Sequence, residues 1–161
     1  RRQRQMCIRD RLMYHMKPTD AVALYNRYIG DWGGTSTSYR FEAVKNGKVV
    51  KVVRKEPVTS MHLSAEPDHQ NLTERHTYEA AEIRIRALDQ NDNIVSFYQE
   101  PVVLSTEGPI AIIGPEIISL QGGMGGTYVR TTGEEGVGIL KIKAAQMEEQ
   151  RILFEVKNDR K

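Results

Sequence analysis

Short apolar and β-branched runs, separated by turn residues, dominate the second half of the chain. The runs are rich in Ile, Val, Thr and Tyr. Gly-Pro occurs twice among them, at 108–109 and 114–115, and Gly-Gly occurs twice, at 122–123 and 125–126. Such punctuation every few residues is typical of an all-β sandwich. The β-type runs in this stretch are 110–113, 117–120, 127–131 and 138–142.

The pattern predicts a complete immunoglobulin-like β-sandwich over residues 59–157, followed by a short tail at 158–161. Within 81–87 apolar and charged residues alternate strictly, so one face of that strand is expected to be buried and the other wet. Seven short strands joined by turns suit an immunoglobulin-like arrangement. The expected strands are 61–65, 78–88, 102–105, 110–113, 127–131, 138–143 and 151–157.

A short helix is predicted over residues 18–29. Pro18 suits a first-turn position, Asp20 suits the N-terminal end of the helix dipole, and Gly30 suits a C-cap. Apolar side chains at three- and four-residue spacing give the helix one apolar face. That face is the candidate docking surface for a neighbouring domain, and its residues are Ala21, Leu24, Tyr25 and Tyr28.

A β-hairpin is predicted next, with strands at 38–44 and 48–54. Asn46-Gly47 lies between them and adopts positive φ at low cost, as a two-residue hairpin turn requires. An isolated helix and hairpin bury too little to fold alone. Residues 12–58 are therefore expected to be the tail of a preceding sandwich domain or a packed extension of the next one, with the boundary at Glu56-Pro57. The fold class is thus mainly β, an immunoglobulin-like sandwich preceded by a helix and a hairpin.

The first eleven residues are set apart by charge. They carry five arginines and one aspartate, a net +4, which leaves −2 for the rest of a chain whose total is +2. They contain no apolar core of a signal peptide. The string 4–11 resembles translated sequencing-adapter read-through, and a disordered basic leader is the alternative. Either way, residues 1–11 are excluded from the predicted fold.

Size, charge and composition exclude several classes of function. At 161 residues the chain is too short for a (β/α)8 barrel, which needs roughly 200 residues or more. The chain after residue 11 is slightly acidic, which argues against nucleic-acid binding. No apolar run approaches the about 20 residues needed to span a membrane. Cys7, the single cysteine, lies in the leader and leaves the redox compartment open. A cytoplasmic location is slightly favoured over a secreted one.

The amino-acid sequences of several turns and adjoining strands resemble those of a known protein family. The segments are Ile-Arg-Ile-Arg-Ala-Leu-Asp-Gln-Asn at 83–91, Phe-Tyr-Gln-Glu-Pro-Val at 97–102, Glu-Gly-Pro-Ile at 107–110, Ile-Gly-Pro at 113–115, and Leu-Gln-Gly-Gly-Met-Gly-Gly-Thr-Tyr-Val-Arg-Thr-Thr-Gly at 120–133. Together they resemble the C-terminal immunoglobulin-like domain of bacterial glycoside hydrolase family 2 enzymes, the β-galactosidase group. The likeness extends upstream through 24–33 and 39–43, so it covers roughly residues 13–157.

The resemblance implies a fragment of a multidomain hydrolase whose sugar-binding, sandwich and barrel domains lie upstream. In that family two barrel glutamates, an acid/base and a nucleophile, cleave the β-glycosidic bond with retention. No position of this chain matches either glutamate motif, so no catalytic residue is assigned.

The paired carboxylates and the histidines are better explained as ordinary surface residues than as a catalytic or metal-binding site. The paired carboxylates at 134–135 and 148–149 are expected in solvated turns, because neighbouring strand residues point to opposite faces. The histidines lack the spacing of a zinc set, so neither a metal nor any other cofactor is expected. They are His15, His62, His69 and His76.

Three segments carry residues that partly match ligand-binding motifs. Residues 89–93 with Glu100 place oxygen-bearing side chains at calcium-loop positions, but Ile94 replaces the required glycine, so a polar hairpin turn is preferred. The glycines of 122–126 lack the Lys and Ser/Thr of a phosphate loop and are expected to permit positive φ. The triplet 71–73 fits an N-glycosylation acceptor, which matters only in a eukaryotic secretory context.

The sequence is compatible with three functions. The first is a non-catalytic accessory domain that packs against upstream domains of the same polypeptide. The second is a carbohydrate-binding module in which Trp32, the single tryptophan, contacts an oligosaccharide, although packing of Trp32 is favoured over sugar contact. The third is a bacterial surface-adhesion domain, a class that predicts tandem copies, and no internal repeat is visible.

Overall fold

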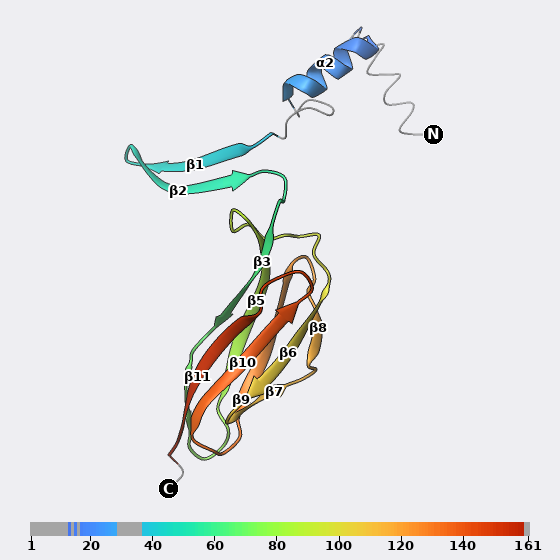
Figure 1. Ribbon diagram of the computed structural model, residues 1–161. Helices are drawn as coiled ribbons and strands as arrows, with labels where there is room; N and C mark the ends of the chain where they lie inside the picture. Colours follow the sequence, from blue (N-terminus) through green and yellow to red (C-terminus); the bar gives the residue numbers. More distant parts are fainter. Residues whose placement is uncertain (1–12, 14, 16, 29–36, 160–161) are drawn as a thin grey trace. The chain divides into compact units, whose positions relative to one another are not determined.

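The computed structural model describes residues 13, 15, 17–28 and 37–159 (Figure 1). The chain divides into two compact units between Pro57 and Val58. The leader, Gly30 and Trp32 lie outside the described residues.

The first unit contains the predicted helix. Helix α2 spans Pro18–Tyr28, with Asp20 in its first turn and Arg27 in its last. The Asp20 carboxylate accepts a hydrogen bond from the backbone N–H of Lys17 at 2.7 Å, and the N–H of Asp20 donates to the Lys17 carbonyl at 3.0 Å. These contacts satisfy groups at the end of a helix that have no partner within it, which explains why the helix begins here.

The hairpin is confirmed within one residue at its ends. Strand β1 spans Tyr39–Lys45 and pairs antiparallel with β2, which spans Lys48–Lys55. Asn46 and Gly47 have φ angles of 51° and 73°. Two successive positive φ values match the right-handed twist of the flanking strands, so this dipeptide sets the register of the pair.

The second unit is a two-layered β-sandwich (Figure 1). One layer is a five-stranded sheet in the order β4-β11-β10-β6-β8, and the other is a four-stranded sheet in the order β3-β5-β9-β7. All neighbouring strands are antiparallel except β4 and β11, which run parallel. The strands are β3 Met61–Pro67, β4 Asn71–Glu74, β5 Ala80–Asp89, β6 Pro101–Glu107, β7 Ile110–Ile113, β8 Ile117–Ser119, β9 Met124–Thr131, β10 Gly136–Ala144 and β11 Gln150–Asn158.

The expected list of seven strands is wrong in number, because the described part of this unit holds nine. Strand β8 matches the apolar run at 117–120, which the list left out. Strand β4 falls on 71–74, where the sequence suggested a glycosylation triplet, and Leu72 within it is fully buried. Strand β5 starts at Ala80 rather than at Tyr78, and β9 starts at Met124 rather than at Thr127.

The core lies between the two sheets and follows the alternation of the strands. Residues 81–89 of β5 alternate between buried and more exposed positions, with Ile83 and Ile85 fully buried. Phe154 of β11 and Leu140 of β10 are also fully buried and come from the opposite sheet. Because both inner faces are apolar, the sandwich closes its own core. No described helix has the length and apolar character needed to cross a membrane.

Candidate functional site

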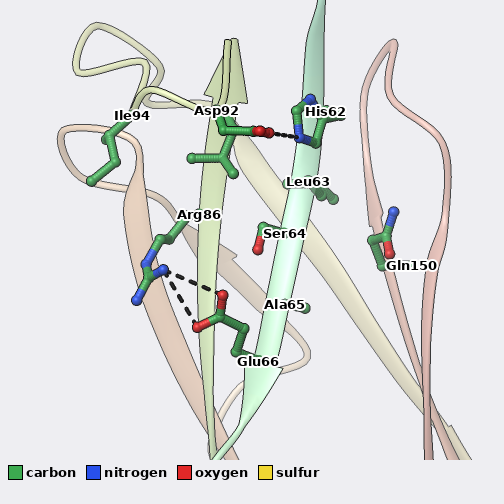
Figure 2. A pocket seen from close by; sticks show the side chains of 10 residues that line it. His62, Leu63, Ser64, Ala65, Glu66, Arg86, Asp92, Ile94 and Gln150 are labelled. Atoms are coloured by element: carbon green, nitrogen blue, oxygen red, sulfur yellow. Dashed lines mark hydrogen bonds and ion pairs between the residues drawn. The ribbon is translucent and has the colours of Figure 1, made fainter. Parts of the chain in front are cut away.

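A shallow cavity of about 610 Å³ lies on the outer face of the four-stranded sheet (Figure 2). Strand β3 contributes His62, Ser64 and Glu66, because alternate residues of a strand share a face. Arg86 of β5 lies opposite Ser64 in the antiparallel register. Asp92 comes from the turn that follows β5, and Gln150 is the first residue of β11, so the cavity gathers polar side chains from three strands and one turn.

Two ion pairs occupy this cavity, and Figure 2 shows both. The Nε2 atom of His62 lies 3.3 Å from Oδ1 of Asp92, and Nη1 of Arg86 lies 3.4 Å from Oε2 of Glu66. The side chains of Asp92 and Glu66 are 82% and 60% exposed. Exposed pairs of this kind contribute at most about 1 kcal/mol, so they shape the surface more than they stabilise it.

Ser64, His62 and Asp92 together suggest a nucleophile, a base and an orienting acid, but their geometry does not fit that chemistry. In a hydrolytic triad one imidazole nitrogen contacts the serine while the other contacts a buried carboxylate. Here Nε2 of His62 pairs with the solvent-exposed carboxylate of Asp92. Among the described residues Ser64 makes no hydrogen bond to His62. The cavity is therefore a polar surface without an activated nucleophile.

The paired glutamates lie in loops. Residues 134–135 lie between β9 and β10, and residues 148–149 lie between β10 and β11. A Glu135 carboxylate oxygen accepts the backbone N–H of Asn158 at 3.1 Å. Glu149 pairs with Arg151 at 2.7 Å, and the hydrogen bond from this guanidinium lowers the pKa of the glutamate. Each of these two carboxylates thus has a local structural partner.

Residues 89–93 form a turn organised by one carboxylate. Asp89 is 5% exposed, and its Oδ1 atom accepts the backbone N–H groups of Asn91 at 2.8 Å and Asn93 at 2.9 Å. The amide nitrogen of the Asn93 side chain contacts both carboxylate oxygens at 3.1 and 3.0 Å. Asp92 takes the positive φ of 59° that closes the turn. An Asp side chain that binds its own following backbone is a turn device, which agrees with the predicted polar hairpin turn.

His69 lies between two carboxylates. Its Nδ1 atom is 2.9 Å from Oδ1 of Asp68, and its Nε2 atom is 3.5 Å from Oε1 of Glu79, too far for a well-formed hydrogen bond. Partial burial raises the pKa of Asp68, but hydrogen bonds from the His69 and Glu82 backbones and the nearby His69 ring outweigh it, so the pKa is lowered overall. His15 and His76 are exposed. In the described part of the chain no group of three or more His, Cys, Asp or Glu side chains is arranged to hold a metal ion.

The predicted docking face of the helix is open to solvent where it is described. Leu24 is 43% exposed, Tyr25 is 38% exposed and Ala21 is also exposed. The side chain of Tyr28 and the whole of Trp32 lie outside the described residues. The docking role of this face and the sugar-contact role of Trp32 therefore stay predictions.

The glycine run is only partly the tight connection that the sequence predicts. Gly122 and Gly123 have φ angles of 60° and 76°, as expected. Gly125 and Gly126 instead lie inside β9, so positive φ was the wrong expectation for them. Gly126 pairs with Arg84 of β5. A β-carbon on Gly126 would lie 3.0 Å from the carbonyl oxygen of Ile83, so the two strands approach closely at this position.

Sequence reasoning did not single out Ser64, Arg86 or Asp92. The signal was available, because alternation within 61–67 places His62, Ser64 and Glu66 on one face. Which residues of another strand lie opposite this face depends on the pairing register. A single sequence does not give that register.

No protein-family model matches the chain. A β-galactosidase from Rhizobium radiobacter is 35% identical over 136 residues, which is 80% of this chain and 93% of that protein. A β-galactosidase from Rhizobium meliloti is 32% identical over 123 residues, which is 72% of this chain but 16% of that protein. The chain thus spans most of one relative and a small part of the other.

Solved structures show the same fold. A β-glycosidase from Bacteroides vulgatus matches with a TM-score of 0.63 and 16% identity, covering 80% of this chain and 19% of that one. A glycosyl hydrolase family 2 member from Bacteroides cellulosilyticus matches with a TM-score of 0.61 and 16% identity, covering 74% of this chain and 17% of that one. At these identities the likeness concerns the fold alone.

Proposed function

Because the chain belongs to the β-galactosidases of glycoside hydrolase family 2, in which its sandwich corresponds to the C-terminal immunoglobulin-like domain, we propose that it serves as a non-catalytic accessory region. Its role is to pack against other domains of the enzyme and to stiffen their arrangement. The reaction of the parent enzyme is then the retaining hydrolysis of terminal β-galactosides.

The hairpin β1–β2 carries the proposal of a packing role. Its apolar side chains are exposed on both faces: Phe41 is 58% exposed beside Val53 on one face, and Val52 is 41% exposed beside Glu42 on the other. The rings of Tyr39 and Phe41 stack with their centroids 6.5 Å apart. A two-stranded hairpin is marginally stable in water by itself, so both faces call for cover by further protein.

Residues 12–58 are accordingly proposed to complete a preceding sandwich domain.

The hairpin also indicates the charge of the surface that would cover it. Between residues 39 and 55 the chain has six Lys or Arg residues and a single acidic one, Glu42. Such a ribbon favours a partner surface that combines apolar and acidic groups.

The carboxylates support the absence of catalysis from this part of the enzyme. A retaining glycosidase needs two carboxyl groups about 5 to 5.5 Å apart in a cleft, one of them kept protonated by its surroundings. Glu149 instead has its pKa lowered by Arg151, which keeps it ionised. Glu135 is held by a backbone N–H. Both carboxylates serve loops of the sandwich.

An assay with 2-nitrophenyl β-D-galactoside tests this directly. The purified chain is expected to release nitrophenol no faster than buffer. Turnover that copurifies with the chain and disappears in the double variant Glu135→Gln, Glu149→Gln would contradict the proposal.

The packing role has its own test in the thermal unfolding of the sandwich. Tyr25→Ser changes an exposed residue of the helix in the first unit, so the Tm of the sandwich is expected to stay unchanged. Phe154→Ala is the control, because emptying a fully buried ring site costs about 3 to 5 kcal/mol and lowers the Tm. If Tyr25→Ser also lowers the Tm markedly, the helix belongs to the core of the sandwich and not to an interdomain surface.

A further inference from the structure

A second cavity, of about 430 Å³, lies at one end of the sandwich. The turn before β6 contributes residues 97–100, and the connection between β10 and β11 contributes residues 145–146. Met61, the first residue of β3, completes the wall. The volume is within the range of small-molecule sites, which are about 300 to 1,000 Å³, so the cavity can hold one long side chain of another molecule.

An aromatic ring on the lining is open to solvent. Phe97 is 67% exposed, the most exposed of the large apolar residues described. The face of such a ring carries partial negative charge and attracts a cation placed over it. Phe97 therefore offers the cavity both an apolar contact and a preference for positive charge.

Glu100 brings a carboxylate to the same lining. Its side chain is exposed and forms no ion pair with a cation among the described residues. Burial and then the negative charge of Glu100 raise the pKa of Tyr98, so the field of this carboxylate reaches the wall of the cavity. The Tyr98 hydroxyl itself is buried, which leaves Glu100 as the accessible ionisable group of the lining.

The two glutamines of the lining add further acceptors. The side chains of Gln99 and Gln146 are exposed, and neither hydrogen-bonds to another described residue. Their amide oxygens can accept hydrogen bonds beside the carboxylate of Glu100. No Lys, Arg or His belongs to the lining, so an anionic ligand would find no opposite charge there.

A guanidinium group matches this set of features better than an ammonium group does. It is planar and stacks on an aromatic face, and its five N–H donors can serve a carboxylate and an amide oxygen together. An ammonium group has three donors and no flat face. The lining therefore favours arginine over lysine.

We propose that this cavity binds the guanidinium group of an arginine side chain on a partner polypeptide, with the planar group on Phe97 and its donors directed at Glu100 and Gln146. Residues 58–161 carry more acidic than basic side chains, which favours the approach of a basic segment. The proposal goes beyond the packing role of the hairpin and does not depend on it. The cavity beside His62 is a weaker candidate, because its charged side chains already pair with one another.

The test is a titration of the full chain with Nα-acetylarginine amide, followed by ¹H–¹⁵N spectra. Saturable shifts are expected at the amides of 97–100 and 145–146, with a Kd of about 1 mM for a ligand of this size. Nα-acetylcitrulline amide has nearly the same shape without the charge and is expected to bind at least about tenfold more weakly. Nα-acetyllysine amide is also expected to bind more weakly than the arginine probe, and added salt is expected to weaken the binding of arginine.

Variants at two exposed positions separate the carboxylate from the ring. Glu100→Gln keeps the shape of the side chain and is expected to weaken arginine binding at least about tenfold. Phe97→Leu keeps an apolar side chain without the ring and is expected to weaken it about two- to fivefold. The Tm is expected to stay unchanged in both variants, because both side chains are exposed.

Two matched controls lie outside the lining. Glu155→Gln changes an exposed carboxylate of β11, and Tyr128→Leu removes a 50% exposed ring from β9. Both are expected to leave the affinity for arginine unchanged. The proposal is overturned by the absence of saturable shifts, by citrulline or lysine binding as tightly as arginine, or by unchanged affinity in Glu100→Gln.

Discussion

At the scale of single residues, buried carboxylates hold the loops of the sandwich in place. Asp89 orders the turn after β5, and Glu74 is 1% exposed and accepts the backbone N–H of Gly133 at 2.9 Å. Gly133 in turn accepts the side-chain amide of Asn158 through its carbonyl at 2.6 Å. Charged groups this deeply buried are uncommon unless they are hydrogen-bonded, so their role is structural.

Asp89→Ala is predicted to destabilise the fold by about 2 to 3 kcal/mol, because it leaves two partly buried N–H groups of the turn without their acceptor. Urea unfolding of the full chain measures this. Asp92→Asn in the same turn is the control, since Asn tolerates the positive φ at this position and the exposed pair with His62 is worth at most about 1 kcal/mol. Equal losses in both variants would show that Asp89 does not organise the turn.

Glu74→Ala is predicted to cost about 1 to 3 kcal/mol, because the partly buried N–H of Gly133 loses its acceptor. Glu74→Gln keeps a carbonyl acceptor and is expected to lose less. Thermal unfolding of the two variants gives the comparison. A larger loss in Glu74→Gln than in Glu74→Ala would refute the assigned role of the carboxylate.

Asp68 makes stability depend on pH in a defined direction. Its pKa is lowered below the ordinary value of 3.8 in the folded chain, so the ionised form stabilises the fold above that value. This contribution is lost as the pH falls through the folded-state pKa. Wild type is therefore predicted to be more stable than Asp68→Asn near neutral pH, with the difference closing at strongly acidic pH. A difference that grows on acidification would contradict the assignment.

At the scale of elements, positive φ angles at turns decide where strands end. Gly108 lies between β6 and β7 with a φ of 76°, and a β-carbon there would clash with the carbonyl oxygen of Val137. Gly114 between β7 and β8 has a φ of 115°, but nothing lies within 4 Å of its β-carbon position. The first glycine meets two constraints and the second meets one.

Gly108→Ala is accordingly predicted to destabilise the sandwich by more than about 2 kcal/mol, and Gly114→Ala by about 1 kcal/mol, from strain alone. Chemical denaturation of both variants measures the difference. If Gly114→Ala is the more harmful substitution, close packing at Gly108 is not what limits this turn.

Elements with strong local signals could be predicted from the sequence. The hairpin follows from Asn46-Gly47, the helix start from Pro18 and Asp20, and β5 from its strict alternation. Strand β4 was missed because it has four residues and pairs parallel with β11, more than eighty residues later in the chain. A contact that distant leaves no local pattern.

The candidate sites could be predicted less well than the fold. Polar residues on one strand can be grouped by alternation, but the cavity beside Tyr98 joins residues 97–100 with Gln146 and Met61. The sequence marks 97–102 as part of a family resemblance and Glu100 as a calcium-loop position, and neither pattern groups these residues with Gln146 or Met61. That no cationic side chain belongs to this lining becomes visible only when the fold is known.

At the scale of the whole molecule, the two units differ in charge and in how well they bury apolar surface. Residues 1–57 carry thirteen Lys or Arg against five Asp or Glu, a net +8, whereas residues 58–161 carry ten against sixteen, a net −6. The sandwich encloses its own apolar core, while the hairpin of the first unit has apolar residues exposed on both faces. An accessory region that completes and packs against other domains accounts for this contrast.

Hydrogen exchange of the isolated 161-residue chain tests this account most directly. Amides of β5, β10 and β11 are predicted to be strongly protected, because these strands belong to a closed core. Amides of β1 and β2 are predicted to exchange orders of magnitude faster, because the uncovered hairpin opens readily. Protection of β1 and β2 equal to that of the sandwich strands would show that the first unit is complete without further domains, and would contradict the proposed role.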